Sequence, residues 1–150
     1  MKNLGLLLTA GLSAGILMMP PAEAHEHKSH SERTEAPADA VAYIISPQNG
    51  EKVSTKFKVK FGLTGMGVAP AGVNAPHTGH HHLMVDKTEL PALDKPMGGD
   101  VIHFGAGQTE TELELEPGEH TLQIILGDMN HVPHDPVVVS EVVTITVVED

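Results

Sequence analysis

The histidines are the residues of this sequence that are best suited to do chemistry. The chain has 150 residues, of which 11 are His and none is Cys. His80–His82 stand directly before an apolar run, and His131 and His134 form a His-x-x-His pair around Pro133. Imidazole is a ligand for zinc, copper, nickel and iron, and without cysteine a thiolate copper centre is excluded. The composition and spacing therefore predict a metal site made of histidines.

Strand geometry divides the three consecutive histidines between two faces. Side chains alternate along a β-strand, so His80 and His82 point to one face and His81 to the other. Leu83 and Val85 are predicted to face the core, which places His81 on the core side. We therefore expect His80 and His82 on the outer face or rim, where a pair two residues apart can chelate one ion.

The elements that must position these side chains are short β-strands separated by Gly- and Pro-rich turns. They predict an all-β fold, an immunoglobulin-like two-sheet antiparallel sandwich of about seven strands. In that arrangement the strands 41–46, 56–63, 101–104 and 109–116 share one sheet. Lysines alternate along 56–63 and glutamates along 109–116, so antiparallel pairing would bring opposite charges together. The predicted strands are 41–46, 56–63, 80–86, 101–104, 109–116, 120–127 and 141–148.

This topology brings most histidines of the domain to one end of the sandwich, because alternate loops lie at the same end. His77 is expected to be an ordinary loop residue there, and His120 falls at the opposite end, where a structural role is expected. The predicted metal ligands are His80, His82, His131 and His134, with His103 as a further ligand or support. The alternative is that these histidines form a buried hydrogen-bond network or a pH-responsive surface.

We predict copper as the metal, with zinc as the alternative. Met66, Met84 and Met129 fall near the same end in the sequence, and thioether sulfur favours Cu(I). The alternative is that these methionines only fill the core and loops. Asp128 and Asp135 flank the second histidine pair and are candidates to accept the second N–H of a ligating imidazole.

The N-terminal residues 1–24 are predicted to be a signal peptide, with an apolar segment followed by Ala22-Glu23-Ala24 as the cleavage site. Residues 25–40 are polar and are predicted to be a disordered tether, and residues 41–150 the folded domain. We expect a periplasmic or secreted protein with no membrane span after cleavage. The cleaved chain would begin His25-Glu26-His27, a pattern suited to Cu(II), although a solvated cluster is the alternative.

The formal net charge of −11 argues against nucleic acid as a partner, because phosphates require cationic partners. Three classes of function remain. The first is binding or delivery of a transition-metal ion. The second is a zinc- or copper-dependent enzyme, for which no nucleophile motif is present. The third is an interaction module for an envelope protein partner, with structural histidines.

The chain resembles the bacterial DUF4399 family over about residues 45–147. The resemblance lies in Gly79-His80-His81-His82, in the segment from His103 to Asp128, and in His131-Val132-Pro133-His134. It implies an exported β-domain with GHHH and HxPH motifs, and it implies no particular reaction.

Overall fold

The computed structural model describes residues 33–149, and these residues contain β-strands, turns and loops without a helix. None of the described residues forms a helix long and apolar enough to cross a membrane. The predicted all-β class and the two-sheet arrangement are confirmed, with sheets of three and six strands. The strands are β1 (Val41–Ser46), β2 (Lys52–Ser54), β3 (Lys56–Thr64), β4 (Gly67–Val68), β5 (Thr78–Val85), β6 (Ile102–His103), β7 (Glu110–Glu114), β8 (Gly118–Gly127) and β9 (Val143–Val148).

The first sheet contains β1, β3 and β7, which are antiparallel neighbours in this order. Strict alternation in β3 buries Phe57, Val59 and Phe61 on one face and exposes the lysines on the other. The predicted charge pairing between β3 and β7 is confirmed by two ion pairs. The Nζ–Oε1 distance is 2.8 Å both for Lys56 with Glu112 and for Lys58 with Glu110.

The second sheet has the order β2-β9-β8-β5-β4, and β6 pairs with β5. The prediction that 101–104 joins the strands of the first sheet is therefore wrong. Ile102 pairs with Leu83 and His103 pairs with His82, antiparallel to β5. Alternation in this segment predicts which side chains share a face but does not specify the neighbouring strand. Of the four strands predicted to share the first sheet, β1, β3 and β7 do so and β6 does not.

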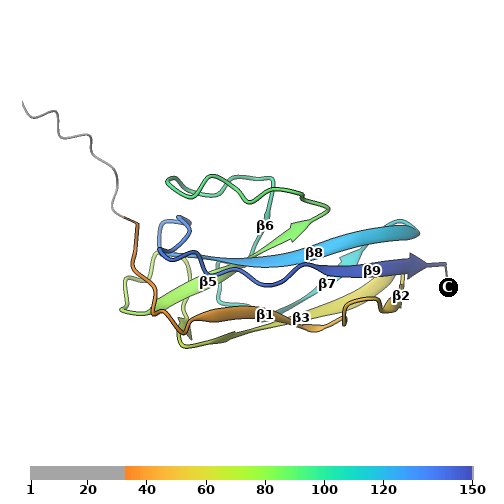
Figure 1. Cartoon of the computed structure of the whole chain (residues 1–150), viewed down its shortest axis with the longest axis horizontal. Coiled ribbons are helices and arrows are strands. Elements are labelled where there is room, and N and C mark those ends of the chain that lie inside the picture. The colour runs from red at the N-terminus through yellow and green to blue at the C-terminus, as the bar shows by residue number, and fades with distance from the viewer. Residues whose placement is uncertain (1–32, 150) are drawn as a thin grey trace, which may run out of the picture.

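Two hydrophobic clusters lie on opposite faces of the second sheet. The larger cluster fills the space between the sheets and includes Phe61, Leu83, Leu122 and Ile145. The smaller cluster contains Met84, Met97, Val101 and Ile125. In Figure 1 the segment between β5 and β6 arches over the side of β5 and β8 that faces away from β1 and β3. This segment covers the outer face of the second sheet, which is where His80 and His82 point.

Residues 33–40 differ from the predicted disordered tether. Ala36 is buried, its N–H donates to the Asp135 carbonyl at 2.9 Å, and the Asp135 N–H donates to the Thr34 carbonyl at 3.0 Å. The Arg33 guanidinium also donates to the Pro133 and His134 carbonyls. Polar composition predicted a solvated segment, but backbone hydrogen bonds with Asp135 and side-chain hydrogen bonds from Arg33 join it to the loop after β8. The predicted signal peptide 1–24, residues 25–32 of the predicted tether, and His25-Glu26-His27 lie outside the described residues.

Candidate metal centre

Four imidazole rings meet on the outer face of the second sheet. His80 and His82 project from β5, His103 comes from β6, and His131 comes from the loop that follows β8. Strand alternation places His80 and His82 on one face, as predicted, and pairing of β6 with β5 sets His103 directly opposite His82. His81 faces the core, also as predicted, with its ring centroid 4.8 Å from that of Phe61.

The ring centroids define a compact group, which we call the histidine cluster: His80, His82, His103 and His131. His80 lies 4.7 Å from His82, 5.0 Å from His103 and 5.0 Å from His131. His103 lies 4.6 Å from His131 and 5.1 Å from His82. The widest separation is 6.0 Å, between His82 and His131. These distances bring each ring into the neighbourhood of the other three.

All three β5 histidines are buried without hydrogen bonds in the described residues, and two of them, His80 and His82, belong to the cluster. His80 is 0% exposed and His82 is 1% exposed, and neither ring nitrogen of either residue has a hydrogen-bond partner within residues 33–149. Buried polar groups in folded proteins are normally satisfied, and leaving one unpaired costs about 1–3 kcal/mol. The four unpaired nitrogens therefore point to a ligand that binds between the rings.

The environment disfavours protonation of three of these imidazoles, His80, His82 and His103. Burial, together with the neighbouring His131 and His103 imidazoles, lowers the pKa of His80 to about 4. Burial and the imidazoles of His80 and His103 lower the pKa of His82 to about 3. The pKa of His103 is also lowered, first by burial and then by His131. Because only neutral imidazole has a free lone pair, these shifts make the rings available to a metal at neutral pH.

Three members of the cluster have a spacing suited to one metal ion. One nitrogen each from His80, His103 and His131 can be chosen so that all lie within 4.8 Å of one another. Nitrogens bound to one ion at about 2.0–2.1 Å are no more than about 4.2 Å apart, so the rings need to close only slightly. His80 is buried, His131 is half-buried and His103 is exposed, so His103 has the most freedom to make this movement.

A glycine makes room for the His82 ring. Gly127 lies opposite His80 in the β5–β8 register. A Cβ atom at Gly127 would lie 2.7 Å from Cε1 of His82 and 2.8 Å from Cε of Met97. Both distances are shorter than carbon atoms tolerate, so a larger residue at this position would displace the ring or the methionine. The sequence signal for this role was weak, because a glycine at a strand end also reads as a turn.

Asp128 shapes the loop that presents His131. Its Oδ1 accepts hydrogen bonds from the N–H groups of Asn130 at 2.8 Å and Val132 at 3.0 Å, and its Oδ2 accepts one from the Thr34 hydroxyl at 2.6 Å. The His131 N–H donates to the Asp128 carbonyl at 2.9 Å. The carboxylate was a candidate acceptor for an imidazole N–H, and in the structure these hydrogen bonds join it to the loop backbone and to Thr34. Asp128 therefore holds the loop in shape.

His134 lies apart from the cluster although it was predicted as a ligand with His131. Its Nε2 lies 3.2 Å from the Thr78 carbonyl oxygen, and its Cε1 would lie 2.8 Å from a Cβ atom at Gly79. Gly79 precedes His80 in β5, so it faces the other side of the sheet. His131 begins this pair in a left-handed backbone conformation, with a φ of 69°. Sequence spacing alone does not reveal such a conformation.

The two remaining histidines of the predicted domain have other environments. His120 has the hydrogen bonds expected of a structural residue. Its Nδ1 lies 2.7 Å from Oδ2 of Asp86, and its Nε2 lies 2.9 Å from the Glu116 carbonyl oxygen. These interactions raise the pKa of His120, with the Asp86 hydrogen bond as the largest cause. His77 is an exposed turn residue with a φ of 53°, as expected of an ordinary loop position.

The methionines predicted near the histidines lie in different environments. Met66 packs against the larger hydrophobic cluster, Met84 is buried in the smaller one, and Met129 lines a small hollow with Asp128. The methionine next to the His82 ring is Met97, which the sequence did not single out. It precedes Gly98-Gly99 in a loop without periodicity, so no sequence pattern connected it with the histidines.

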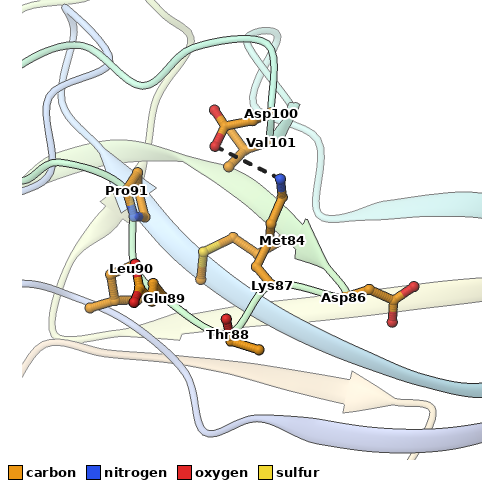
Figure 2. Close-up of a pocket in the computed structure, with 9 residues that line it drawn as sticks. All are labelled: Met84, Asp86, Lys87, Thr88, Glu89, Leu90, Pro91, Asp100 and Val101. Atoms are coloured by element: carbon orange, nitrogen blue, oxygen red, sulfur yellow. Dashed lines mark ion pairs between the residues drawn. The ribbon is translucent and has the colours of Figure 1, made fainter.

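A separate cavity of about 310 Å³ opens beside the smaller hydrophobic cluster. Figure 2 shows Met84 extending among the residues that line it, with Lys87 reaching toward Asp100 across the opening. The Nζ of Lys87 lies 4.0 Å from Oδ2 of Asp100. No histidine lines this cavity, and its charged side chains are exposed. The candidate metal site is therefore the histidine cluster and not this cavity.

Comparison with known proteins agrees with the resemblance seen in the sequence. The family model described as "Domain of unknown function (DUF4399)" matches residues 59–148, which is more than half of the chain. Comparisons with curated proteins and with solved structures gave no match. The matched region includes every residue of the histidine cluster. The chain therefore belongs to the DUF4399 family.

Proposed function

We propose that the protein is an exported transition-metal-binding protein that takes up copper, or alternatively zinc, at the histidine cluster. The observation that carries the proposal is the pair of buried imidazoles, His80 and His82, whose four ring nitrogens have no hydrogen-bond partner. His103 and His131 stand next to them with nitrogens within reach of the same ion. We assign His80, His103 and His131 as ligands and His82 as the fourth imidazole.

The donor set favours copper and zinc. Imidazole nitrogen suits both ions, and Cu(II) binds most nitrogen sites more tightly than other divalent ions of its row. Calcium and magnesium prefer oxygen ligands, so a site of four imidazoles does not suit them.

The proposed role is buffering or delivery of the metal in the cell envelope. His103 is exposed while His80 and His82 are buried, so one ligand of the site is accessible from outside. An accessible ligand allows an envelope protein partner to exchange metal with the site without opening the fold. The predicted export signal supports a periplasmic or secreted location, where such a partner would be met.

The test is a titration of the purified, untagged protein with Cu(II) and with Zn(II) by calorimetry. We expect one ion per chain with submicromolar affinity. The double variant His103→Asn/His131→Asn should lose this binding. Asn tolerates the left-handed backbone at His131, and neither side chain is fully buried, so the fold should persist.

The matched control is His77→Asn, which removes an exposed histidine at a similar backbone conformation. Its binding should equal that of the natural protein. A second variant, His25→Ala/His27→Ala, separates the cluster from the N-terminal histidines. Loss of binding only in that second variant would place the metal on the N-terminal residues and refute the proposal. Absence of binding to the natural protein would refute it as well.

A further inference from the structure

We propose that Met97 supplies a thioether ligand to the histidine cluster, so that the site holds Cu(I) as well as divalent ions. This inference rests on the proposed role of the cluster as a metal site. Imidazole alone suits Cu(II) and Zn(II), whereas thioether sulfur is a soft donor that favours Cu(I). A site with both donor types retains copper in either oxidation state.

The side chain of Met97 meets the cluster at Gly127. The point that a Gly127 Cβ would occupy lies 2.8 Å from Cε of Met97, 2.7 Å from Cε1 of His82 and 3.1 Å from Nδ1 of His82. The methionine methyl group and the imidazole thus both lie close to the same point beside Gly127. That point is free because residue 127 is glycine.

The backbone of Met97 is tied to a second member of the cluster. Its N–H donates to the His131 carbonyl at 2.9 Å. Met97 therefore contacts the loop that carries His131 through its main chain and approaches His82 through its side chain. These contacts hold Met97 close to His82 and to His131, although it is distant from both histidines in the sequence.

The surroundings suit a soft ion. Met97 is 9% exposed and packs with Val101 and Ile125 in the smaller hydrophobic cluster. An apolar setting limits the access of water to a bound ion. The methionine side chain has three rotatable bonds, so its sulfur can change direction without movement of the backbone.

Met84 provides a matched control. It is buried to 2% and belongs to the same hydrophobic cluster as Met97. Its side chain also lines the cavity beside Lys87 and Leu90 (Figure 2). Replacing either methionine with leucine conserves volume, and such changes usually cost less than about 1.5 kcal/mol in stability. The two variants thus lose one thioether each from the same hydrophobic cluster.

The experiment measures Cu(I) affinity under anaerobic conditions, by competition with a chromophoric Cu(I) chelator, in the untagged protein and in both variants. We expect Met97→Leu to weaken Cu(I) binding by about tenfold or more and to leave Zn(II) binding unchanged. Met84→Leu should leave both affinities unchanged. X-ray absorption of the Cu(I)-loaded protein should show a copper–sulfur distance that is absent in Met97→Leu.

The outcomes separate this inference from the proposed function. If the natural protein binds neither Cu(II) nor Zn(II), the histidine site itself is refuted. If it binds those ions but Met97→Leu keeps full Cu(I) affinity, or the absorption spectrum contains no sulfur contribution, only the role of Met97 is overturned. An equal loss of Cu(I) affinity in Met84→Leu would likewise overturn it, because the effect would then come from packing.

Discussion

Individual histidines in this protein have opposite electrostatic environments. His80 and His82 are buried next to other imidazoles, and both conditions disfavour protonation. His120 faces the Asp86 carboxylate, which favours protonation. The same side chain is therefore favoured in its neutral form at one place and in its protonated form at another.

Protonation of single residues provides the first prediction. At about pH 5, the metal-free protein should have neutral rings at His80 and His82, because this pH lies above their pKa values of about 4 and about 3. His120 should be protonated at the same pH, because its pKa is raised above the ordinary value of 6.5. Nitrogen-15 NMR of the imidazole rings distinguishes the two states. Titration of all three residues together near pH 6.5 would contradict this account of the cluster.

The second prediction concerns the space beside His82. Gly127→Ala should weaken metal binding by about tenfold or more, because the added methyl group would lie 2.7 Å from the His82 ring. Calorimetric titration with Zn(II) measures the change. Gly99→Ala is the control, because a Cβ atom there meets nothing within 4 Å. Equal zinc affinity in both variants would show that the His82 ring needs no such space.

Among the elements, the loop after β8 determines where His131 lies. Asp128 is 5% exposed and accepts hydrogen bonds from two backbone N–H groups and from the Thr34 hydroxyl. The residues that shape this loop therefore influence the position of His131 without belonging to the histidine cluster. They also join the loop to the segment that begins with Arg33, whose guanidinium donates to the Pro133 carbonyl at 3.1 Å.

The third prediction follows from that loop. Asp128→Ala should reduce the free energy of unfolding by about 1–3 kcal/mol, because two N–H groups of the loop lose their acceptor. It should also weaken Zn(II) binding, since His131 loses its fixed position. Thr34→Val removes only the hydroxyl hydrogen bond to Asp128 and should have a smaller effect on both quantities. Chemical denaturation and calorimetry measure them, and unchanged zinc affinity in Asp128→Ala would contradict a positioning role.

The elements also show what the sequence could and could not predict. Alternation predicted the faces of His80, His81 and His82, because a strand fixes side-chain direction locally. It did not predict that β6 pairs with β5, because a strand of two residues carries little information about its partner. The approach of Met97 depends on contacts between distant segments, which no local pattern encodes.

For the whole molecule, a metal at the cluster would connect β5, β6 and the loop after β8. The fourth prediction is that Zn(II) raises the unfolding temperature of the natural protein. An ion at about 100 times its Kd adds about 2.7 kcal/mol, which corresponds to a rise of several degrees. A chelator should reverse the rise, and His103→Asn/His131→Asn should not show it. An equal rise in that variant would mean that zinc stabilises the fold from another site.

The ion pairs between β3 and β7 have a consequence for how copies of the protein meet. β7 is an edge strand of its sheet, and its outward glutamates lie beside the lysines of β3. A second molecule that added its own β7 to this edge would bring two rows of carboxylates together, and like charges on adjacent strands repel. The lysines stabilise the sheet from within, while the glutamates discourage its growth beyond one chain. Dissolved salt screens that repulsion, so ionic strength sets how strongly this edge resists self-association.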